Sequence, residues 1–193
     1  MQIQPVNHKN IFYPPGGILL WIIIFLELFT FGMALIAMTV YSKDELEVFH
    51  NSRLLLNTAF GTINTVFLIT SGFFMAISVN YLKQKNTKKS LLFLALTMLG
   101  GVLFLVLKSV EYIDKIEAGL TIGYNTFFTF YWMLTLFHVI HVLVGLVILI
   151  SVYVGLKKEK STTTIEDVEA SAAFWHMCDL IWLLLFPIIY LLF

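Results

Sequence analysis

Long apolar segments alternate with short polar ones along almost the whole chain. Five segments reach the length of about 20 helical residues that crosses the hydrocarbon core of a bilayer. They are residues 18–40, 54–82, 91–107, 124–156 and 172–193. Because backbone polar groups find no water at that depth, each segment is predicted to be an α-helix. The pattern predicts one all-α membrane domain over residues 1–193, an integral bundle of five transmembrane helices.

The second segment indicates how the predicted helices pack. Small and polar residues recur in it at steps of three and four, which places them on one face of a helix. They are Asn57, Gly61, Asn64, Thr65, Leu68, Ser71, Gly72 and Met75. Such a stripe is typical of a seam where membrane helices approach closely and form hydrogen bonds with one another. We therefore expect a packing seam here rather than a path for a substrate.

Composition supports the membrane interpretation and excludes several classes of function. The chain is 59% hydrophobic and 12% charged, whereas soluble domains average about 25% charged residues. Basic and acidic residues both number 12, so no basic excess favours nucleic acid as a partner. The single cysteine, Cys178, excludes an internal disulfide and a paired-thiolate metal site. The N-terminus, with Pro5, Pro14 and Pro15, lacks the pattern of a cleaved signal peptide, so we expect the first span to be retained.

Positive charge is unevenly distributed between the two sides of the predicted bundle. Eight lysines fall on the side of the N-terminal tail, and four lysines or arginines fall on the other. The first group is Lys9, Lys83, Lys85, Lys88, Lys89, Lys157, Lys158 and Lys160, and the second is Lys43, Arg53, Lys108 and Lys115. Since cytoplasmic loops carry the excess of positive residues, we expect the N-terminus inside and the C-terminus outside.

Five ionisable residues are predicted to lie at membrane depth, where a charge costs about 2.5 to 3.5 kcal/mol on insertion scales. They are Glu27, His138, His141, His176 and Asp179. A helix rise of about 1.5 Å per residue brings all five toward the inner half of the bilayer, where they could form one polar cluster. Lys108 and Glu111, one turn apart at the outer end of the third span, are expected to form an interfacial charged pair, worth well under about 1 kcal/mol if exposed.

Three kinds of chemistry are open to the polar cluster. His138 and His176, on facing helices, could ligate a haem through its two axial positions. A carboxylate with histidines could relay protons in a small proton-coupled membrane transporter. In the simplest interpretation the cluster holds helix to helix, with Glu27 neutral because burial disfavours its charge. The spacings contain no recognisable site by which this chain alone would hold a redox metal.

Five stretches, one in each predicted span, resemble subunit III of the haem-copper respiratory oxidases, and they occur in the order that this family has them. They are WIIIFLELFTFG around Glu27, LLLNTAFGTINTVFLITSG, LGGVLFLVLKSVEY up to Glu111 and Tyr112, FHVIHVLVGLVIL with His138 and His141, and AFWHMCDLIWLLLF with His176 and Asp179. Together they cover nearly all the chain from Trp21 to Trp182. Each stretch is weak alone, but five in one order make a specific match.

The resemblance implies a function. Such a subunit is all-helical and packs against catalytic subunit I and other subunits of a complex that oxidises cytochrome c and reduces oxygen to water. It binds no haem, copper or other metal, binds phospholipid between its helices, and supports assembly, stability and proton uptake. It also protects the catalytic centre from inactivation during turnover. The chain would then have no catalytic residues and would lie in the bacterial cytoplasmic membrane.

The resemblance also implies roles for single residues. Glu27 corresponds to the intramembrane glutamate of the family that reacts with carbodiimides, although Leu26 stands where the family often has a small hydroxylated residue. The structural or lipid-contacting positions are His138, His141, His176, Asp179 and Glu111, none of them a metal ligand. The chain matches from the third of the family's seven spans, so we do not expect the two-helix half that encloses the lipid cleft. Five-span forms also occur in quinol oxidases and in accessory proteins of nitric oxide reductase, and both are alternatives.

Overall fold

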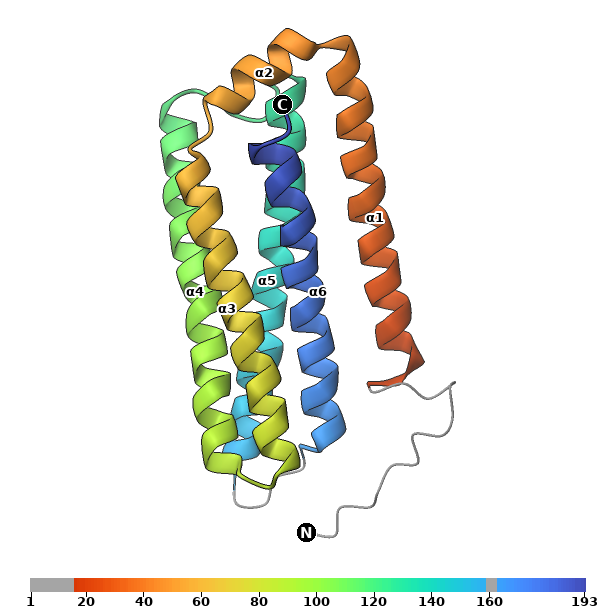
Figure 1. Cartoon of the computed structure of the whole chain (residues 1–193), viewed down its shortest axis with the longest axis vertical. Helices are drawn as coiled ribbons and strands as arrows, with labels where there is room; N and C mark the ends of the chain where they lie inside the picture. Colours follow the sequence, from red (N-terminus) through yellow and green to blue (C-terminus); the bar gives the residue numbers. More distant parts are fainter. Residues whose placement is uncertain (1–15, 159–162) are drawn as a thin grey trace.

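The computed structural model describes residues 16–158 and 163–193, and the regular structure in this part of the chain is helical. Five long helices run the length of a bundle, and one short helix crosses its end (Figure 1). Their bounds are α1 Gly17–Asp44, α2 Leu46–Leu54, α3 Thr58–Lys83, α4 Thr87–Glu117, α5 Thr126–Lys157 and α6 Ile165–Tyr190. All but α2 are long and apolar enough to cross a membrane, which confirms the predicted fold class.

Two of the long helices extend well beyond the apolar segments that predicted them. α4 continues to Glu117, past the predicted end at residue 107, and α6 begins at Ile165, ahead of the predicted start at residue 172. Both extensions are rich in charged residues. Hydropathy detects the part of a helix that lies in hydrocarbon, so it does not report where the hydrogen-bonded helix ends.

Side-chain caps fix where four of the helices begin. The side-chain oxygens of Asn57, Asn86 and Asn125 each accept a hydrogen bond from a backbone N–H in the first turn of α3, α4 and α5. Thr164 begins α6 with a capping box, in which it and Asp167 bond reciprocally. Each cap satisfies an N–H that has no partner within the helix and is worth about 1 kcal/mol. Because Asn86 caps α4 so soon after the end of α3, the linker between these two helices consists only of residues 84–86.

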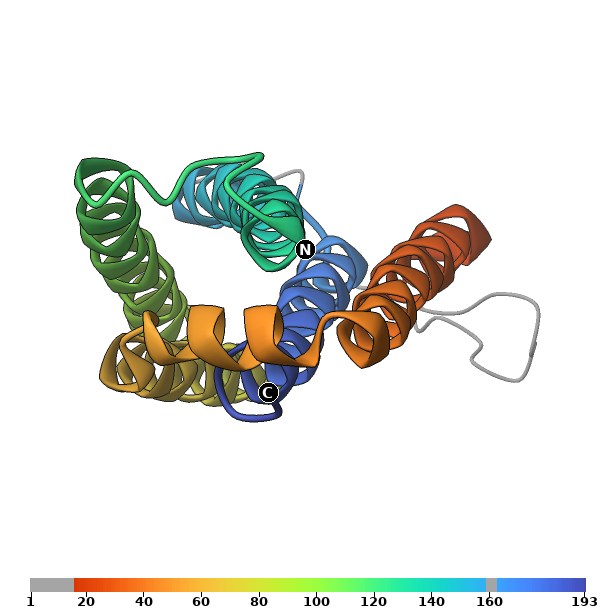
Figure 2. The same ribbon diagram turned by 90° about the horizontal axis from the view of Figure 1, so that it is seen from above.

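The short helix α2 was not among the predicted elements, because its 9 residues are too few to span a bilayer. It lies across one end of the bundle, between α1 and α3 (Figures 1 and 2). Phe49 anchors it in the core, with its ring centroid 5.5 Å from that of Phe127 and 5.1 Å from that of Phe193. We call this end the α2 end. The opposite, lysine-rich end carries Lys83, Lys85, Lys88, Lys89, Lys157 and Lys158, while Lys9 and Lys160 lie outside the described residues.

The polar stripe predicted in the second segment is the buried face of α3. Its buried members are Gly61, Asn64, Leu68, Ser71, Gly72 and Met75. Ser71 donates a hydrogen bond to the carbonyl of Thr97 at 2.8 Å, and Ser78 donates to the carbonyl of Ser90 at the same distance. These bonds tie α3 to α4, so the predicted packing seam is confirmed. Asn57 is the exception, because it is exposed and caps the helix.

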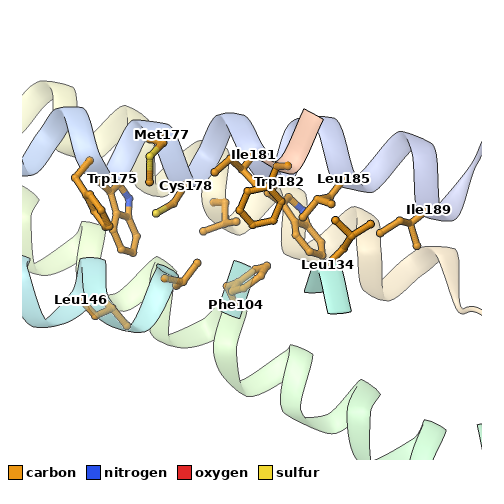
Figure 3. Close-up of a cluster of buried hydrophobic side chains, with 14 of the residues drawn as sticks. Phe104, Leu134, Leu146, Trp175, Met177, Cys178, Ile181, Trp182, Leu185 and Ile189 are labelled. Carbon is orange, nitrogen blue, oxygen red and sulfur yellow. The ribbon is translucent and has the colours of Figure 1, made fainter. Parts of the chain in front are cut away.

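Helix α6 is the most buried of the five long helices and lies at the centre of the core (Figure 3). Trp175 projects from it into a slot formed by Gly101 of α4 and Gly145 of α5. A Cβ atom at these glycines would lie 2.6 and 2.9 Å from the indole ring. The indole N–H donates to the hydroxyl of Ser71 at 3.0 Å. Buried residues from all six helices join in one apolar cluster around this centre.

Candidate functional site

A fully buried ion pair lies inside the bundle toward the α2 end. Lys108 and Glu111 of α4 are both 0% exposed. The Nζ atom of Lys108 lies 3.0 Å from Oε2 of Glu111. The expectation of an interfacial charged pair is therefore wrong, because the face of α4 that carries both residues turns toward α5 and α6 instead of toward solvent.

Two tyrosine hydroxyls complete a closed hydrogen-bond network around this pair. Besides Glu111, the Lys108 ammonium donates to the hydroxyls of Tyr131 at 3.2 Å and Tyr190 at 2.7 Å. These hydroxyls in turn donate to Oε1 of Glu111, at 2.9 and 2.6 Å. An ammonium has three N–H donors, and all three are used. The network has no net charge and joins α4, α5 and α6.

Aromatic rings surround the same ammonium. The Nζ atom of Lys108 lies 5.1, 4.8, 5.4 and 5.4 Å from the ring centroids of Tyr112, Tyr131, Trp182 and Tyr190. A desolvated cation gains up to about 2 kcal/mol from an aromatic face, which offsets part of the several kcal/mol that leaving water costs. Because every donor of the ammonium is already paired, the network offers no free N–H to a ligand. Its bonds hold α4, α5 and α6 together.

A second polar contact joins α1 to α5 near the middle of both helices. Oε2 of Glu27 lies 3.2 Å from Nε2 of His141. The other ring nitrogen, Nδ1, lies 2.8 Å from the carbonyl oxygen of Phe137. A carbonyl can only accept, so Nδ1 carries the proton and Nε2 faces the carboxyl group. The Glu27 contact has the distance of an ion pair without the alignment of a hydrogen bond.

A third polar contact lies on α6. Nδ1 of His176 is 3.4 Å from Oδ2 of Asp179, one helical turn further along. The same oxygen lies against Gly72 of α3, where any Cβ would overlap it. Oδ1 of Asp179 has no hydrogen-bond partner among the residues that the structure describes. Gly72 therefore gives this carboxyl group the space to lie between α3 and α6.

His138 is fully buried among aromatic rings. Its ring centroid lies 5.5 Å from that of Phe104, 5.3 Å from that of Trp182 and 6.5 Å from that of Phe31. Within residues 16–158 and 163–193, neither ring nitrogen has a hydrogen-bond partner. This position packs the imidazole as an aromatic ring rather than presenting it to Glu27.

The structure divides the predicted polar cluster into parts. Glu27 meets His141, His176 meets Asp179, and His138 lies apart from both contacts; no hydrogen bond or ion pair between described residues joins the three parts. Nor does the described part of the chain bring together three or more His, Cys, Asp or Glu side chains in a way that could hold a metal ion.

The members of the buried network that sequence reasoning missed are Tyr131 and Tyr190. The signal that could have found them is a charged pair within an apolar segment, LVLKSVEY, since such a pair needs polar partners from neighbouring spans. Both tyrosines lie toward the same end of their spans as Lys108 does. Depth matches the two tyrosines to Lys108 and Glu111, while the rotation of α4 that brings the four side chains together is set by packing.

Known proteins are similar to this chain over the region of its five long helices. The family model described as cytochrome c oxidase subunit III matches residues 18–192. Cytochrome bo(3) ubiquinol oxidase subunit 3 of Buchnera aphidicola is 25% identical over 173 residues, which cover 89% of this chain and 84% of that protein. Cytochrome c oxidase subunit 3 of Synechocystis is 32% identical over 132 residues, which cover 67% of this chain and 55% of that protein.

A third relative is similar to this chain over a comparable length. Cytochrome c oxidase subunit 3 of Rhipicephalus sanguineus is 34% identical over 129 residues, which cover 66% of this chain and 49% of that protein. The chain thus spans about half the length of the two cytochrome c oxidase relatives. Since the family match takes in all five long helices, the chain belongs to the cytochrome c oxidase subunit III family of the haem-copper oxidases.

Proposed function

We propose that this chain is subunit III of a haem-copper terminal oxidase in the bacterial cytoplasmic membrane. It would support the assembly, stability and proton uptake of a complex that oxidises cytochrome c and reduces oxygen to water, packed against catalytic subunit I and other subunits. The observation that carries the proposal is the extent of the family match, which takes in residues 18–192 and so all five long apolar helices.

The haem and copper of the complex would belong to partner subunits, and this chain would supply no catalytic residue. Two histidines and the cysteine of the described residues are already enclosed or engaged within the bundle. His138 is enclosed by aromatic rings, and His141 is engaged by Phe137 and Glu27. Cys178 is the only cysteine of the chain and is buried in the apolar core. These arrangements support a structural use of the polar residues, in a subunit that is not itself a redox protein.

The contact between Glu27 and His141 is the part of the chain to which we assign the support of proton uptake. A carboxyl group and an imidazole 3.2 Å apart can hold a proton between them. Their side chains are 20% and 11% exposed, so the pair is open to a neighbouring subunit or to lipid. Phospholipid between the helices is part of the proposal through the family resemblance.

We also propose that the lysine-rich end faces the cytoplasm. The six described lysines there outnumber Lys43, Arg53 and Lys115 at the α2 end. Lys108 no longer counts as a loop charge, because it is buried within the bundle. The positive-inside rule then favours an N-terminus inside and a C-terminus outside.

Cytochrome c is our first choice as the electron donor, and quinol is the alternative. The relatives named for cytochrome c are the more similar in sequence, at 32% and 34% identity. The relative named for ubiquinol matches a larger share of both chains, at 89% and 84%. The donor site itself would lie on other subunits. An accessory role beside a nitric oxide reductase is the third form of the proposal.

The proposal is tested by purifying the tagged chain from its native membrane in mild detergent. A reduced-minus-oxidised visible spectrum and oxygen uptake with cytochrome c and with quinol are then measured. We expect haem and oxygen uptake to copurify with the chain, and the faster donor to identify the class of oxidase. A colourless, inactive preparation without partners would contradict the proposal and favour a proton-coupled transporter.

The role of Glu27 is tested in the same complex with Glu27→Gln, which keeps the size of the side chain and replaces its carboxyl group with an amide. We expect an unchanged haem content with slower proton uptake or a shorter active lifetime during turnover. Thr30→Ala is the matched control, because Thr30 is exposed about one turn further along α1 and bonds only to the Leu26 carbonyl. Loss of haem in Glu27→Gln would instead indicate a role in folding.

A further inference from the structure

The buried network around Lys108 lies close to the ends of the helices that carry it. Tyr190 is the last residue of α6, Tyr131 lies within the first two turns of α5, and Glu111 lies within the last two turns of α4. All three ends are at the α2 end of the bundle. The three helices therefore supply little cover of their own between this network and the surface, although every member of it is buried.

Helix α2 is tied to the start of α5 by two side-chain hydrogen bonds. Asn125 uses both halves of its side-chain amide, since its oxygen caps α5 and its nitrogen donates to the hydroxyl of Ser52 at 2.7 Å. The hydroxyl of Thr126 donates to Oε1 of Glu45, the residue that precedes α2, at 3.2 Å. The residues that begin α5 are therefore the same residues that hold α2 across the bundle.

Helix α2 is also tied to the end of α6. Nε of Arg53 donates to the backbone carbonyl of Tyr190 at 3.1 Å. A carbonyl in the last turn of a helix has no N–H partner within that helix, so this bond satisfies an acceptor that the helix leaves open. The hydroxyl of the same Tyr190 bridges Lys108 and Glu111. One residue thus joins the buried network to α2.

Three phenylalanine rings form an apolar layer beneath α2. The ring centroid of Phe49 lies 5.5 Å from that of Phe127 and 5.1 Å from that of Phe193, and these two lie 6.2 Å apart. Phe127 comes one turn before Tyr131 in α5, and Phe193 comes three residues after Tyr190, so both lie on the α2 side of the network. Only the ring of Phe49 comes from α2 itself, and it is 1% exposed.

Helix α2 depends on the bundle for its own stability. It has 9 residues, and isolated helices shorter than about 12 to 15 residues are marginal in water. Glu45 at its start makes no side-chain cap, and the backbone of that residue, with a φ of −128° and a ψ of 43°, interrupts the helical path from α1. The backbone hydrogen bonds of the five long helices lie within those helices, so α2 can lift away without breaking them.

We propose that α2 is a latch, which excludes water from the Lys108–Glu111 pair when it is docked and admits water to the pair when it is released. The inference goes beyond the proposed function, because it concerns a motion of this chain alone. In the docked state Phe49 completes the apolar layer and Arg53 holds the end of α6. In the released state both contacts are lost together, and the turn that carries Tyr190 loses its tie.

The first test opens the latch with Phe49→Ala in the full chain within its native complex. A water-soluble carbodiimide with glycinamide converts accessible carboxyl groups to amides, and peptide mass mapping gives the rate at each site. We expect Glu111 to react at least tenfold faster than in the wild type. Val48→Ala is the matched control, because the neighbouring Val48 is 37% exposed. Unchanged labelling of Glu111 would overturn the proposal, and so would an equal rise at Asp179 in the middle of α6, since the whole bundle would then have opened.

The second test closes the latch. Ser52→Cys with Asn125→Cys places two thiols where the native side chains already bond at 2.7 Å, and oxidation by diamide joins them. We expect Glu111 to react at least tenfold more slowly in the oxidised form than after reduction by dithiothreitol. The native Cys178 is buried in the core and lies apart from this pair. Equal rates in the two forms would overturn the proposal. Because both forms are the same protein, the comparison holds even if the Phe49→Ala chain does not accumulate.

Discussion

The ammonium of Lys108 lies 3.0 Å from the carboxylate of Glu111, one helical turn along α4, and both side chains are closed off from the surroundings. The hydroxyl groups that bridge them come from α5 and α6. Loss of one member of such a pair leaves the other as an unpaired charge in an apolar environment. The stability of the bundle should therefore depend on the pair as a unit.

Lys108→Met should lower the free energy of unfolding by about 3 to 5 kcal/mol, because it leaves Glu111 without its counterion. The double variant Lys108→Met with Glu111→Gln should recover much of that loss, since neither charge is then present. Denaturant unfolding of the purified protein in detergent measures both, and a double-mutant cycle gives the coupling. Lys115→Met is the control, because the half-buried Lys115 donates to the Leu55 carbonyl and is bonded to no member of the network. Additive losses in the double variant would contradict the prediction.

Tyr190→Phe should destabilise the protein by about 1 to 3 kcal/mol, because each removed hydroxyl leaves a buried charged group short of a partner. Tyr131→Phe should cost less, since its bonds to Glu111 and Lys108 are longer, at 2.9 and 3.2 Å against 2.6 and 2.7 Å. The midpoint of denaturant unfolding tests the order of the two variants. Tyr124→Phe, at an exposed tyrosine, should leave the midpoint unchanged. A larger effect at Tyr124 than at Tyr190 would argue against the network.

Gly145→Ala should destabilise the bundle by about 1 to 3 kcal/mol, the usual cost of overpacking. The added Cβ would lie 2.9 Å from the indole of Trp175, and that ring is also fixed by its bond to Ser71. Thermal unfolding measures the loss of stability, and the fluorescence emission of the four tryptophans reports any change around the Trp175 ring. Gly32→Ala is the matched control, because it adds the same methyl group in open space. Equal shifts in the two variants would show that the slot around Trp175 is not specific.

A membrane-soluble carbodiimide should label Glu27 in the folded protein and spare Glu111. The side chain of Glu27 is 20% exposed, whereas that of Glu111 is 1% exposed and bonded on both oxygens. Peptide mass mapping after labelling compares the two sites, and Glu27→Gln confirms the assignment of the first. In a denaturing detergent both carboxyl groups should react. Labelling of Glu111 before unfolding would be inconsistent with the closed network.

The parts of the fold that depend on local sequence could be predicted. Span length and hydropathy identified the five long helices, and helical spacing identified the face of α3 that carries Ser71 and Gly72. Helix rise placed Glu27 and His141 at similar depth, and the structure brings them into contact. Each of these properties is set by residues within one helix, so one sequence contains enough information.

The parts that depend on the rotation of helices about their axes could not be predicted. Depth alone did not show that His141 meets Glu27 while His138, one turn away, lies among aromatic rings. A position near the end of an apolar segment is compatible with an exposed or an inward face, so Lys108 and its partner could not be assigned to the interior. Packing against α5 and α6 decides which face of α4 turns inward. The spacing of residues within α4 carries no information about that packing.

The closed network around Lys108 also has a consequence for the order of synthesis. Helix α4 is made before α5 and α6, so its ammonium and carboxylate enter the membrane before Tyr131 and Tyr190 exist. An unshielded charge at that depth is costly, and it persists until the last turn of α6 emerges and supplies Tyr190. A nascent chain stalled within α6 therefore has a Lys108–Glu111 pair inside the bilayer that lacks the hydroxyl of Tyr190. The incompletely bonded pair distinguishes the unfinished polypeptide from the finished one, and a membrane-bound protease or chaperone could recognise it.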